Sequence, residues 1–312
     1  MWDIRPVFEF IIFGLIKIMR SIGKLFIPMK YQMKDISGEI ALVTGAAGGL
    51  GRELALSLVK HGAIVVIWDI NRKGIDETMQ LIRAAGGICY GYVCDVCNCQ
   101  EVYKKAEQVR EEVGQITILI NNAGVINIGK FWEIPDYFFT RSMQVNTMSQ
   151  FWTVKAFLPM MIKNNKGHIV SIASIAAHAG CPNMVDYCAS KHAVAGFFEA
   201  LRLELTYAGY NINTTVISPY IIHNTGMSLD KFSRVMPSLS PSEVAEKTII
   251  SLRCNKHFVL IPASLKILII LKWIMPWGFF VMLTRCFVNY NILYTPKQIE
   301  ESSRKQENSN GI

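Results

Sequence analysis

Two residues four positions apart, Tyr187 and Lys191, offer the clearest chemistry in this sequence. On a helix, residues at positions i and i+4 share a face, so the phenol and the ammonium would be neighbours. A free phenol has a pKa near ~10. A cation about 4 Å away, at an effective dielectric constant of ~20, favours the phenolate by up to ~4 kcal/mol, which lowers the pKa by up to about three. We therefore expect Tyr187 to transfer protons near neutral pH, although an exposed pair of helix residues has the same spacing.

Three further polar residues are expected beside this pair. Ser174 ends a predicted strand thirteen residues before the tyrosine, and its hydroxyl is suited to hold a carbonyl or alcohol oxygen. Asn122 follows another predicted strand, and Asn146 lies in the next predicted helix. Ligand sites of doubly wound sheets lie beyond the carboxyl ends of the strands, so these residues should gather at one edge.

A glycine-rich turn near the start of the chain predicts a phosphate-binding loop. The segment Thr44-Gly45-Ala46-Ala47-Gly48-Gly49-Leu50-Gly51 joins an apolar run to a helix pattern. Glycines allow a tight turn and a close approach of pyrophosphate, and the N-terminus of the next helix favours an anion. Asp69 follows Gly51 by eighteen residues, at the end of the second predicted strand. Together these features indicate a dinucleotide site, whereas the glycines alone would also fit an ordinary turn.

Asp69 favours NAD over NADP as the dinucleotide. A carboxylate here accepts hydrogen bonds from the adenosine ribose and repels the additional 2′-phosphate of NADP. Arg72 and Lys73 are near enough in sequence to soften this repulsion. A solvated helix N-cap is the alternative role of Asp69.

Short apolar runs alternate with helix-period segments, which predicts an α/β fold with a doubly wound parallel sheet. Seven strands are expected, at residues 40–44, 63–69, 88–93, 116–120, 168–173, 212–217 and 258–261. Helices are expected near residues 49–61, 72–85, 99–113, 136–164, 183–208 and 241–252.

Taken in order, these motifs resemble the short-chain dehydrogenase/reductase family over about residues 38–262, and this implies a Rossmann-type domain. The resemblance rests on T-G-x-x-x-G-x-G, N-N-A-G, an Asn, a Ser and Y-x-x-x-K. It implies that Tyr187 is the catalytic acid–base, that Lys191 lowers its pKa and binds the nicotinamide ribose, that Ser174 orients the substrate oxygen, and that Asn146 holds a water for proton relay.

The same resemblance implies a set of cofactor-binding residues and no metal. They are Gly45, Gly49, Leu50, Gly51, Asp69, Asp95, Asn122, Lys191 and Thr225. Within this set Asp95 would contact the adenine, and Asn122 would have a structural role after the fourth strand.

The loop after the sixth strand departs from the family pattern. In the family, a threonine five residues after a proline contacts the nicotinamide carboxamide. Here Thr225 follows Pro219 by six residues, and Tyr220 stands where glycine is usual. The additional residue either bulges outward or displaces Thr225, and a shift near 1 Å is enough to cost about 10²-fold in rate.

The distribution of charge points to a membrane surface. The formal net charge is +8, yet residues 39–252 carry eighteen basic and eighteen acidic side chains. The excess lies in two ends that are rich in large apolar residues, which favours a membrane surface and argues against nucleic acid as a partner. The eight cysteines form no secreted framework. The close group Cys94, Cys97 and Cys99 is interpreted as reduced thiols, with a metal site as the alternative.

Four regions are expected along the chain: a membrane-associating segment at 1–38, the Rossmann-type domain at 39–262, a second apolar membrane-associating segment at 263–295 and a disordered polar tail at 296–312. The first segment has the pattern of an interfacial helix, with an uncleaved signal anchor as the alternative. Apolar residues between 220 and 240 would form a lid over the substrate or belong to the core.

The flanks and residues 169–174 and 225–227 also resemble the membrane-associated 16C branch of the family, which contains retinol and 17-beta-hydroxysteroid dehydrogenases. This likeness implies an NAD-dependent dehydrogenase that interconverts a lipophilic, retinol-like alcohol and its carbonyl. It also implies residence at the endoplasmic reticulum or lipid droplets, with the catalytic domain in the cytosol, and a homodimer through the helices near 136–164 and 183–208. The alternatives are a steroid or long-chain alcohol dehydrogenase and a catalytically weak protein that retains the dinucleotide fold.

Overall fold

The structure is a computed structural model that describes residues 5–225 and 236–288. Its contacts divide the chain into two units, Met1–Asp35 and Ile36–Ile312. The first unit contains helix α1 (Arg5–Leu25) and the short helix α2 (Met29–Gln32). Large apolar side chains of α1 are exposed, among them Phe10 and Phe13. Among the described residues, no helix combines the length and the apolar character needed to span a membrane.

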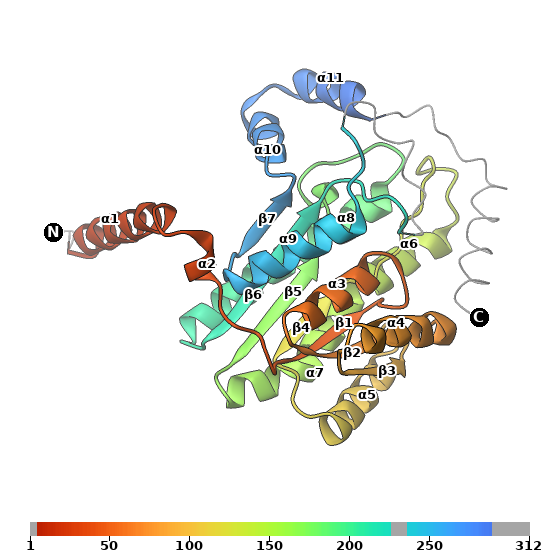
Figure 1. The fold of residues 1–312 in the computed structure, drawn as a ribbon. Helices are drawn as coiled ribbons and strands as arrows, with labels where there is room; N and C mark the ends of the chain where they lie inside the picture. The colour runs from red at the N-terminus through yellow and green to blue at the C-terminus, as the bar shows by residue number, and fades with distance from the viewer. Residues whose placement is uncertain (1–4, 226–235, 289–312) are drawn as a thin grey trace. The chain divides into compact units, whose positions relative to one another are not determined.

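The second unit is built on one seven-stranded parallel sheet, as the sequence predicts (Figure 1). Its strands are β1 (Ile40–Thr44), β2 (Ile64–Asp69), β3 (Cys89–Val93), β4 (Ile118–Asn121), β5 (Gly167–Ile172), β6 (Ile212–Pro219) and β7 (Phe258–Ile261). They lie in the order β3-β2-β1-β4-β5-β6-β7 and all six pairings are parallel. The predicted doubly wound α/β fold is therefore confirmed.

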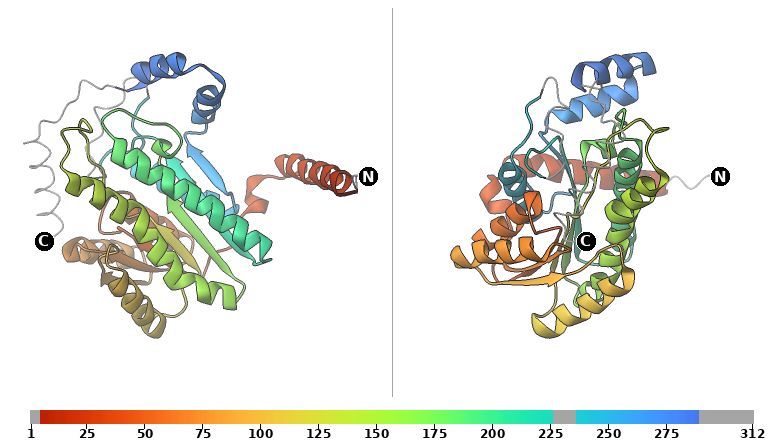
Figure 2. Two further views of the ribbon diagram at one scale, coloured as in Figure 1. Left: turned by 180° about the vertical axis from the view of Figure 1, so that it is seen from behind. Right: turned by 90° about the vertical axis from the view of Figure 1, so that its right-hand side faces the viewer.

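Helices cover both faces of this sheet, which explains why its central strands are apolar at successive positions. Helices α3 (Gly49–Lys60), α4 (Arg72–Ala84) and α9 (Pro241–Arg253) cover one face (Figure 1). Helices α5 (Cys99–Glu112), α7 (Ser149–Lys163) and α8 (Val185–Tyr207) cover the other (Figure 2). In β1, Ala41 and Val43 pack toward the first layer, while Leu42 packs toward the second.

The helix predicted over 136–164 is not continuous. It divides into α6 (Asp136–Met143), a π-helical turn at Gln144–Met148 and α7. Helical periodicity does not distinguish this turn from the α-helix around it, because a π-turn adds a single residue to the helix. Asn146 lies inside the turn.

Past β7 the chain forms two short helices, α10 (Leu265–Ile274) and α11 (Trp277–Phe287). They fall in the segment predicted from its apolar residues to associate with membranes. Both helices expose large apolar side chains, including Ile274 and Trp277. Most of the predicted lid (226–235) and the predicted polar tail lie outside the described residues.

The order of strands reverses between β1 and β4, and the ends of these two strands are joined by side chains. Thr44 Oγ1 accepts hydrogen bonds from the backbone N–H groups of Asn122 and Ala123, each at 3.1 Å. Asn122 Nδ2 in turn donates to the carbonyls of Thr44 and Gly45, each at 3.0 Å. This is the topological switch point at which doubly wound sheets open a crevice for a ligand.

Replacing Thr44 by valine should lower the free energy of unfolding by about 2 kcal/mol, because two amide N–H groups lose their acceptor in a buried place. The measurement is denaturant unfolding followed by circular dichroism. Thr206→Val, at an exposed helical threonine, is the matched control and should be nearly neutral. Equal effects of the two substitutions would contradict the role given to Thr44.

Candidate active site

The glycine turn after β1 has a backbone that only glycine fits well. Gly45 and Gly49 have φ values of +67° and +51°, in the left-handed region. A Cβ atom on Gly51 would lie 2.0 Å from the carbonyl oxygen of Gly45, and one on Gly45 would lie 2.8 Å from the Cα atom of Ala123. The turn therefore presents backbone without side chains at the start of α3, which suits it to bind a pyrophosphate.

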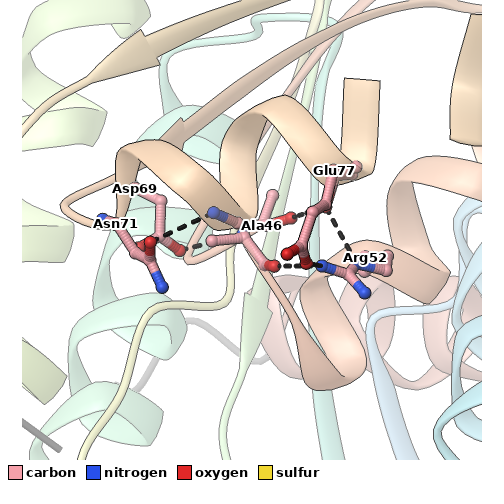
Figure 3. A network of polar contacts seen from close by, with 8 residues as sticks. Ala46, Arg52, Asp69, Asn71 and Glu77 are labelled. Atoms are coloured by element: carbon pink, nitrogen blue, oxygen red, sulfur yellow. Dashed lines mark hydrogen bonds and ion pairs between the residues drawn. The ribbon is translucent and has the colours of Figure 1, made fainter. Parts of the chain in front are cut away.

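A cluster of polar contacts fixes this turn against α4 (Figure 3). Arg52 donates from Nη2 to the carbonyl of Ala47 at 2.7 Å and from Nε to Thr78 Oγ1 at 2.9 Å. Thr78 Oγ1 then donates to the carbonyl of Ala46 at 3.0 Å. Arg52 also forms an ion pair with Glu77, 3.0 Å away.

Asp69 lies at the end of β2 beside the same turn (Figure 3). Its Oδ2 accepts from the backbone N–H of Ala47 at 2.9 Å, and its Oδ1 accepts from that of Asn71 at 3.0 Å. Burial raises the pKa of the carboxyl group, and the backbone hydrogen bonds oppose that rise. The alternative role as helix N-cap falls instead to Asn71, whose side chain accepts from Gly74 N at 3.0 Å.

Ser174, Tyr187 and Lys191 come together at the carboxyl end of β5. Ser174 Oγ accepts from Ala176 N at 3.1 Å, and the Ser174 side chain is near enough to the Tyr187 hydroxyl to lower its pKa. Tyr187 and Lys191 lie on α8, as the spacing predicts, and both are buried. Lys191 Nζ donates to the carbonyl of Ile172 at 3.0 Å and lies 5.7 Å from the centroid of the Tyr187 ring.

Asn146 lies close to this group, and both polar atoms of its side chain have hydrogen-bond partners in the protein. Its Oδ1 accepts from Val125 N at 2.8 Å, and its Nδ2 donates to Val125 O and to Ser190 Oγ, each at 2.9 Å. Its backbone carbonyl accepts from Gln150 Nε2 at 3.0 Å. A carbonyl oxygen has two lone pairs, so the relay water predicted at Asn146 would share this carbonyl with Gln150.

One cavity of about 540 Å³ joins the glycine turn to the Tyr187 group. All of the predicted site residues except Asn146 line it: Gly45, Gly49, Leu50, Gly51, Asp69, Asp95, Asn122, Ser174, Tyr187, Lys191 and Thr225. Apolar residues of α10 and α11 also line it, namely Leu265, Leu268, Ile269, Phe280, Leu283 and Phe287. The cavity therefore combines polar residues suited to a dinucleotide with apolar residues suited to a hydrocarbon.

Residues 39–235 match the family described as short chain dehydrogenase. The chain belongs to the short-chain dehydrogenase family. Over 266 residues it is 40% identical to estradiol 17-beta-dehydrogenase 11 of Mus musculus, covering 85% of this chain and 88% of that protein. It is 38% identical over 279 residues to epidermal retinol dehydrogenase 2 of the same species, covering 88% and 89%.

The fold also matches a solved short-chain dehydrogenase/reductase from Burkholderia phymatum in complex with NAD. The TM-score is 0.71 at 27% sequence identity, over 77% of this chain and 95% of that one. A metagenomic short-chain oxidoreductase in complex with NADP has a TM-score of 0.62 at 25% identity, over 72% and 96%. This dehydrogenase therefore has the fold that binds nicotinamide dinucleotides, and its glycine turn fits the pyrophosphate of either one.

Asp95, predicted to contact the adenine, lines the cavity, and its Oδ1 accepts from Cys97 N at 2.9 Å. In the described ranges, 5–225 and 236–288, no group of three or more His, Cys, Asp or Glu residues is arranged to hold a metal. Burial raises the pKa of the Cys94 and Cys97 thiols to about 12. These two cysteines are therefore protonated thiols at neutral pH.

The electrostatics of the Tyr187–Lys191 pair differ from the expectation. Burial raises the pKa of Tyr187 to about 12, and the hydrogen bond with Ser174 opposes that rise. Burial also lowers the pKa of Lys191 to about 8. The expected lowering of the phenol pKa by the ammonium is thus wrong for the protein's own groups, because loss of water outweighs the attraction and the ammonium donates to Ile172 instead.

The loop after β6, which is one residue longer than the family pattern, is held by backbone hydrogen bonds. Tyr220 N donates to Ile261 O at 2.8 Å, and His223 N donates to Leu239 O at 3.1 Å. Asn224 adopts a left-handed conformation with φ of +54°, which asparagine tolerates. Thr225 then lies beside the glycine turn, its Cα atom 3.1 Å from where a Cβ on Gly49 would be. Its contact with the nicotinamide carboxamide stays a prediction.

Sequence reasoning did not identify the residues that support the site through hydrogen bonds. Arg52 and Thr78 anchor the glycine turn, and Gln150 connects Asn146 to β5 by accepting from Ser171 Oγ at 2.7 Å. Arg52 follows the last glycine of the motif directly, which is a usable signal. A buried glutamine in an otherwise apolar helix is the signal for Gln150, which is 1% exposed.

The low pKa of Lys191 has a consequence for stability. In the unfolded chain Lys191 keeps its proton up to the ordinary lysine pKa of ~10.4, whereas in the folded protein it releases the proton above about pH 8. The free energy of unfolding therefore rises with pH between these two values. We expect the free energy of unfolding of the wild type, relative to Lys191→Met, to rise by on the order of 2 kcal/mol from about pH 8 to about pH 10. Urea unfolding across this range measures it. The exposed Lys155→Met serves as control, and a flat difference for Lys191→Met would contradict the buried ammonium.

Proposed function

We propose that this protein is a membrane-attached, NAD-dependent dehydrogenase of lipophilic, retinol-like alcohols. The observation that carries the proposal is one cavity lined together by the glycine turn, by Ser174 and Tyr187, and by apolar residues of α10 and α11. An alcohol whose hydroxyl reaches Tyr187 has apolar surface in the same cavity for its hydrocarbon part. The names of the relatives, a retinol dehydrogenase and an estradiol dehydrogenase, agree with a lipophilic alcohol.

The reacting hydroxyl would lie between Ser174 and Tyr187. Ser174 holds the substrate oxygen, and Tyr187 removes the hydroxyl proton as hydride leaves the carbinol carbon. A bound oxidised nicotinamide would supply the hydride acceptor and a positive charge near the phenol. This charge and the Lys191 ammonium stabilise the phenolate form of Tyr187, against the burial that raises its pKa.

The proton leaves along Lys191 and Asn146. A Cβ atom on Gly124 would lie 3.6 Å from Lys191 Nζ and 3.3 Å from Asn146 Oδ1, so the absence of a side chain there keeps the two residues close together. The side chain of Asn146 is hydrogen-bonded to Val125 and Ser190, which would fix its backbone carbonyl beside the path of the proton. A water on that carbonyl would take the proton to solvent.

Tyr187→Phe should lower kcat/KM for the oxidation of all-trans-retinol with NAD by about 10²- to 10⁴-fold, because the proton acceptor is lost. The affinity for NAD, measured by titration, should change little. Tyr207→Phe is the matched control, since Tyr207 is 88% exposed, and it should retain wild-type activity. Retention of most activity by Tyr187→Phe would remove the tyrosine from its role.

Preference for NAD rests on Asp69. Its replacement by alanine should lower the ratio of kcat/KM with NAD to that with NADP by about 100-fold, because the carboxylate no longer repels the 2′-phosphate. The exposed Asp136→Ala should leave this ratio unchanged. An Asp69→Ala enzyme with the wild-type ratio would show that the discrimination lies elsewhere.

Attachment to the endoplasmic reticulum or lipid droplets is proposed through the apolar surfaces of the helices at the two ends of the chain. On α10, Ile267, Ile270 and Ile274 follow helical spacing and are 62%, 55% and 72% exposed. On α1, Phe8, Phe10 and Phe13 are 67%, 77% and 64% exposed. Exposed large apolar side chains of this kind favour binding to a membrane surface, and the flanking basic charge suits anionic lipid headgroups.

Replacing Ile267, Ile270 and Ile274 together by serine should lower partition into phosphatidylcholine–phosphatidylserine vesicles by at least about 10-fold, since each buried isoleucine contributes about 1.5–3 kcal/mol. Flotation of the full chain measures this. Leu203→Ser, an exposed apolar residue on α8, is the control and should not change flotation. A wild-type chain that stays with the soluble fraction would contradict membrane attachment.

A hydroxysteroid substrate is the second candidate, because estradiol 17-beta-dehydrogenase 11 is among the similar proteins. A panel of retinol, estradiol and a long-chain alcohol with NAD distinguishes the candidates by kcat/KM. Normal NAD binding without turnover of any of them would favour a non-catalytic role. Association of two copies through α7 and α8 stays a prediction.

A further inference from the structure

The substrate end of the cavity has two walls that come from distant parts of the chain. One is the pair α10–α11, which contributes Leu268, Ile269 and Phe280. The other is the loop 178–184, between Ser174 and Tyr187, which contributes Ala179, Gly180 and Cys181. The width of the cavity depends on what holds these two walls together.

A single lysine of α10 reaches across to that loop. Lys272 Nζ donates to the backbone carbonyl of His178 at 2.6 Å. The same ammonium lies 4.9 Å from the centroid of the Trp273 ring and 5.9 Å from that of Phe280. Charge-assisted hydrogen bonds are stronger than neutral ones, and aromatic faces attract a cation. Lys272 therefore has partners on both walls.

His178 is itself a fixed point of the loop. Its Nε2 is 2.9 Å from Ser218 Oγ, at the end of β6, and its ring packs edge-on against Phe258 of β7, with centroids 4.8 Å apart. Its backbone N–H donates to Ile175 O at 3.0 Å. The carbonyl that accepts from Lys272 therefore belongs to a residue already anchored to the sheet.

We propose that Lys272 is a positioning residue that holds α10–α11 against the loop 178–184 and thereby sets the width of the substrate site. This inference rests on the proposed function and adds a residue that determines the fit of the substrate's hydrocarbon part. Lys272 touches neither the reacting atoms nor the glycine turn. Its loss therefore changes the binding of a long alcohol more than the chemical step.

Lys266, about one and two-thirds turns earlier on the same helix, provides a matched control because its side chain is exposed. Both lysines carry the same charge near the apolar surface of α10. A role in membrane attachment would be shared by the two, whereas the contact with His178 belongs to Lys272.

The test compares wild type, Lys272→Met, Lys272→Arg and Lys266→Met as full-length proteins in detergent micelles. Lys272→Met should raise KM for all-trans-retinol about 10-fold while kcat and the affinity for NAD stay within about 3-fold. Lys272→Arg, which can still donate to the His178 carbonyl, should restore most of the loss. Lys266→Met should match the wild type.

Hydrogen exchange of the peptide that spans residues 175–184 gives a readout independent of turnover. It should be faster in Lys272→Met than in Lys266→Met, because the loop loses its contact with α10. An unchanged exchange rate, or equal changes of KM in the two methionine variants, would overturn the proposal. Faster exchange in a protein that oxidises none of the alcohols would uphold the contact and contradict the proposed function instead.

Discussion

A buried cation governs the catalytic end of the cavity. Lys191 is 3% exposed, and an ammonium removed from water is unfavourable unless other groups share its charge. The carbonyl of Ile172 is one such group. The phenolate of Tyr187 would be another, available once the phenol has given up its proton. The burial that separately disfavours the phenolate and the ammonium also strengthens the attraction between them, which offsets part of that cost when both charges are present. Ser174, beside the phenol, and Asn146, near the ammonium, are positioned around this pair.

The parts that the sequence predicts are those set by short segments. The central strands are covered on both faces, so they appear as nearly unbroken apolar runs, and the seven predicted strands match the observed ones within a few residues. Tyr187 and Lys191 meet because one helical turn brings them together, whatever surrounds the helix. Ser174 joins them because a parallel sheet collects the ends of its strands at one edge. The position of Asp69 beside the glycine turn follows from the same rule, because β2 pairs with β1 in parallel.

What the sequence did not predict depends on groups that are distant along the chain. The pKa of Tyr187 was expected to fall, since spacing reveals the neighbouring charge but not the burial, and burial proved the larger effect. The π-turn around Asn146 adds one residue to a helix and leaves no trace in its periodicity. Gln150 acquires its role only when Ser171 on β5 and the carbonyl of Asn146 are both within reach. The additional residue before Thr225 left two outcomes open, a bulge or a displaced Thr225, and spacing alone does not distinguish them.

The apolar residues of α10 and α11 would affect the proposed proton transfer at Tyr187 as well as the binding of the substrate. An alcohol with a long hydrocarbon part would bind by removing apolar surface from water, and the residues of α10 and α11 that line the cavity offer such surface. The hydroxyl is thereby directed toward Ser174 and Tyr187, where polar partners exist. The same hydrocarbon excludes water from the phenol, which strengthens the attraction between the phenolate and the Lys191 ammonium. A small alcohol would leave water beside Tyr187 and lose both effects, so the proposed selectivity for lipophilic substrates and the proposed electrostatics of proton transfer would have one physical origin.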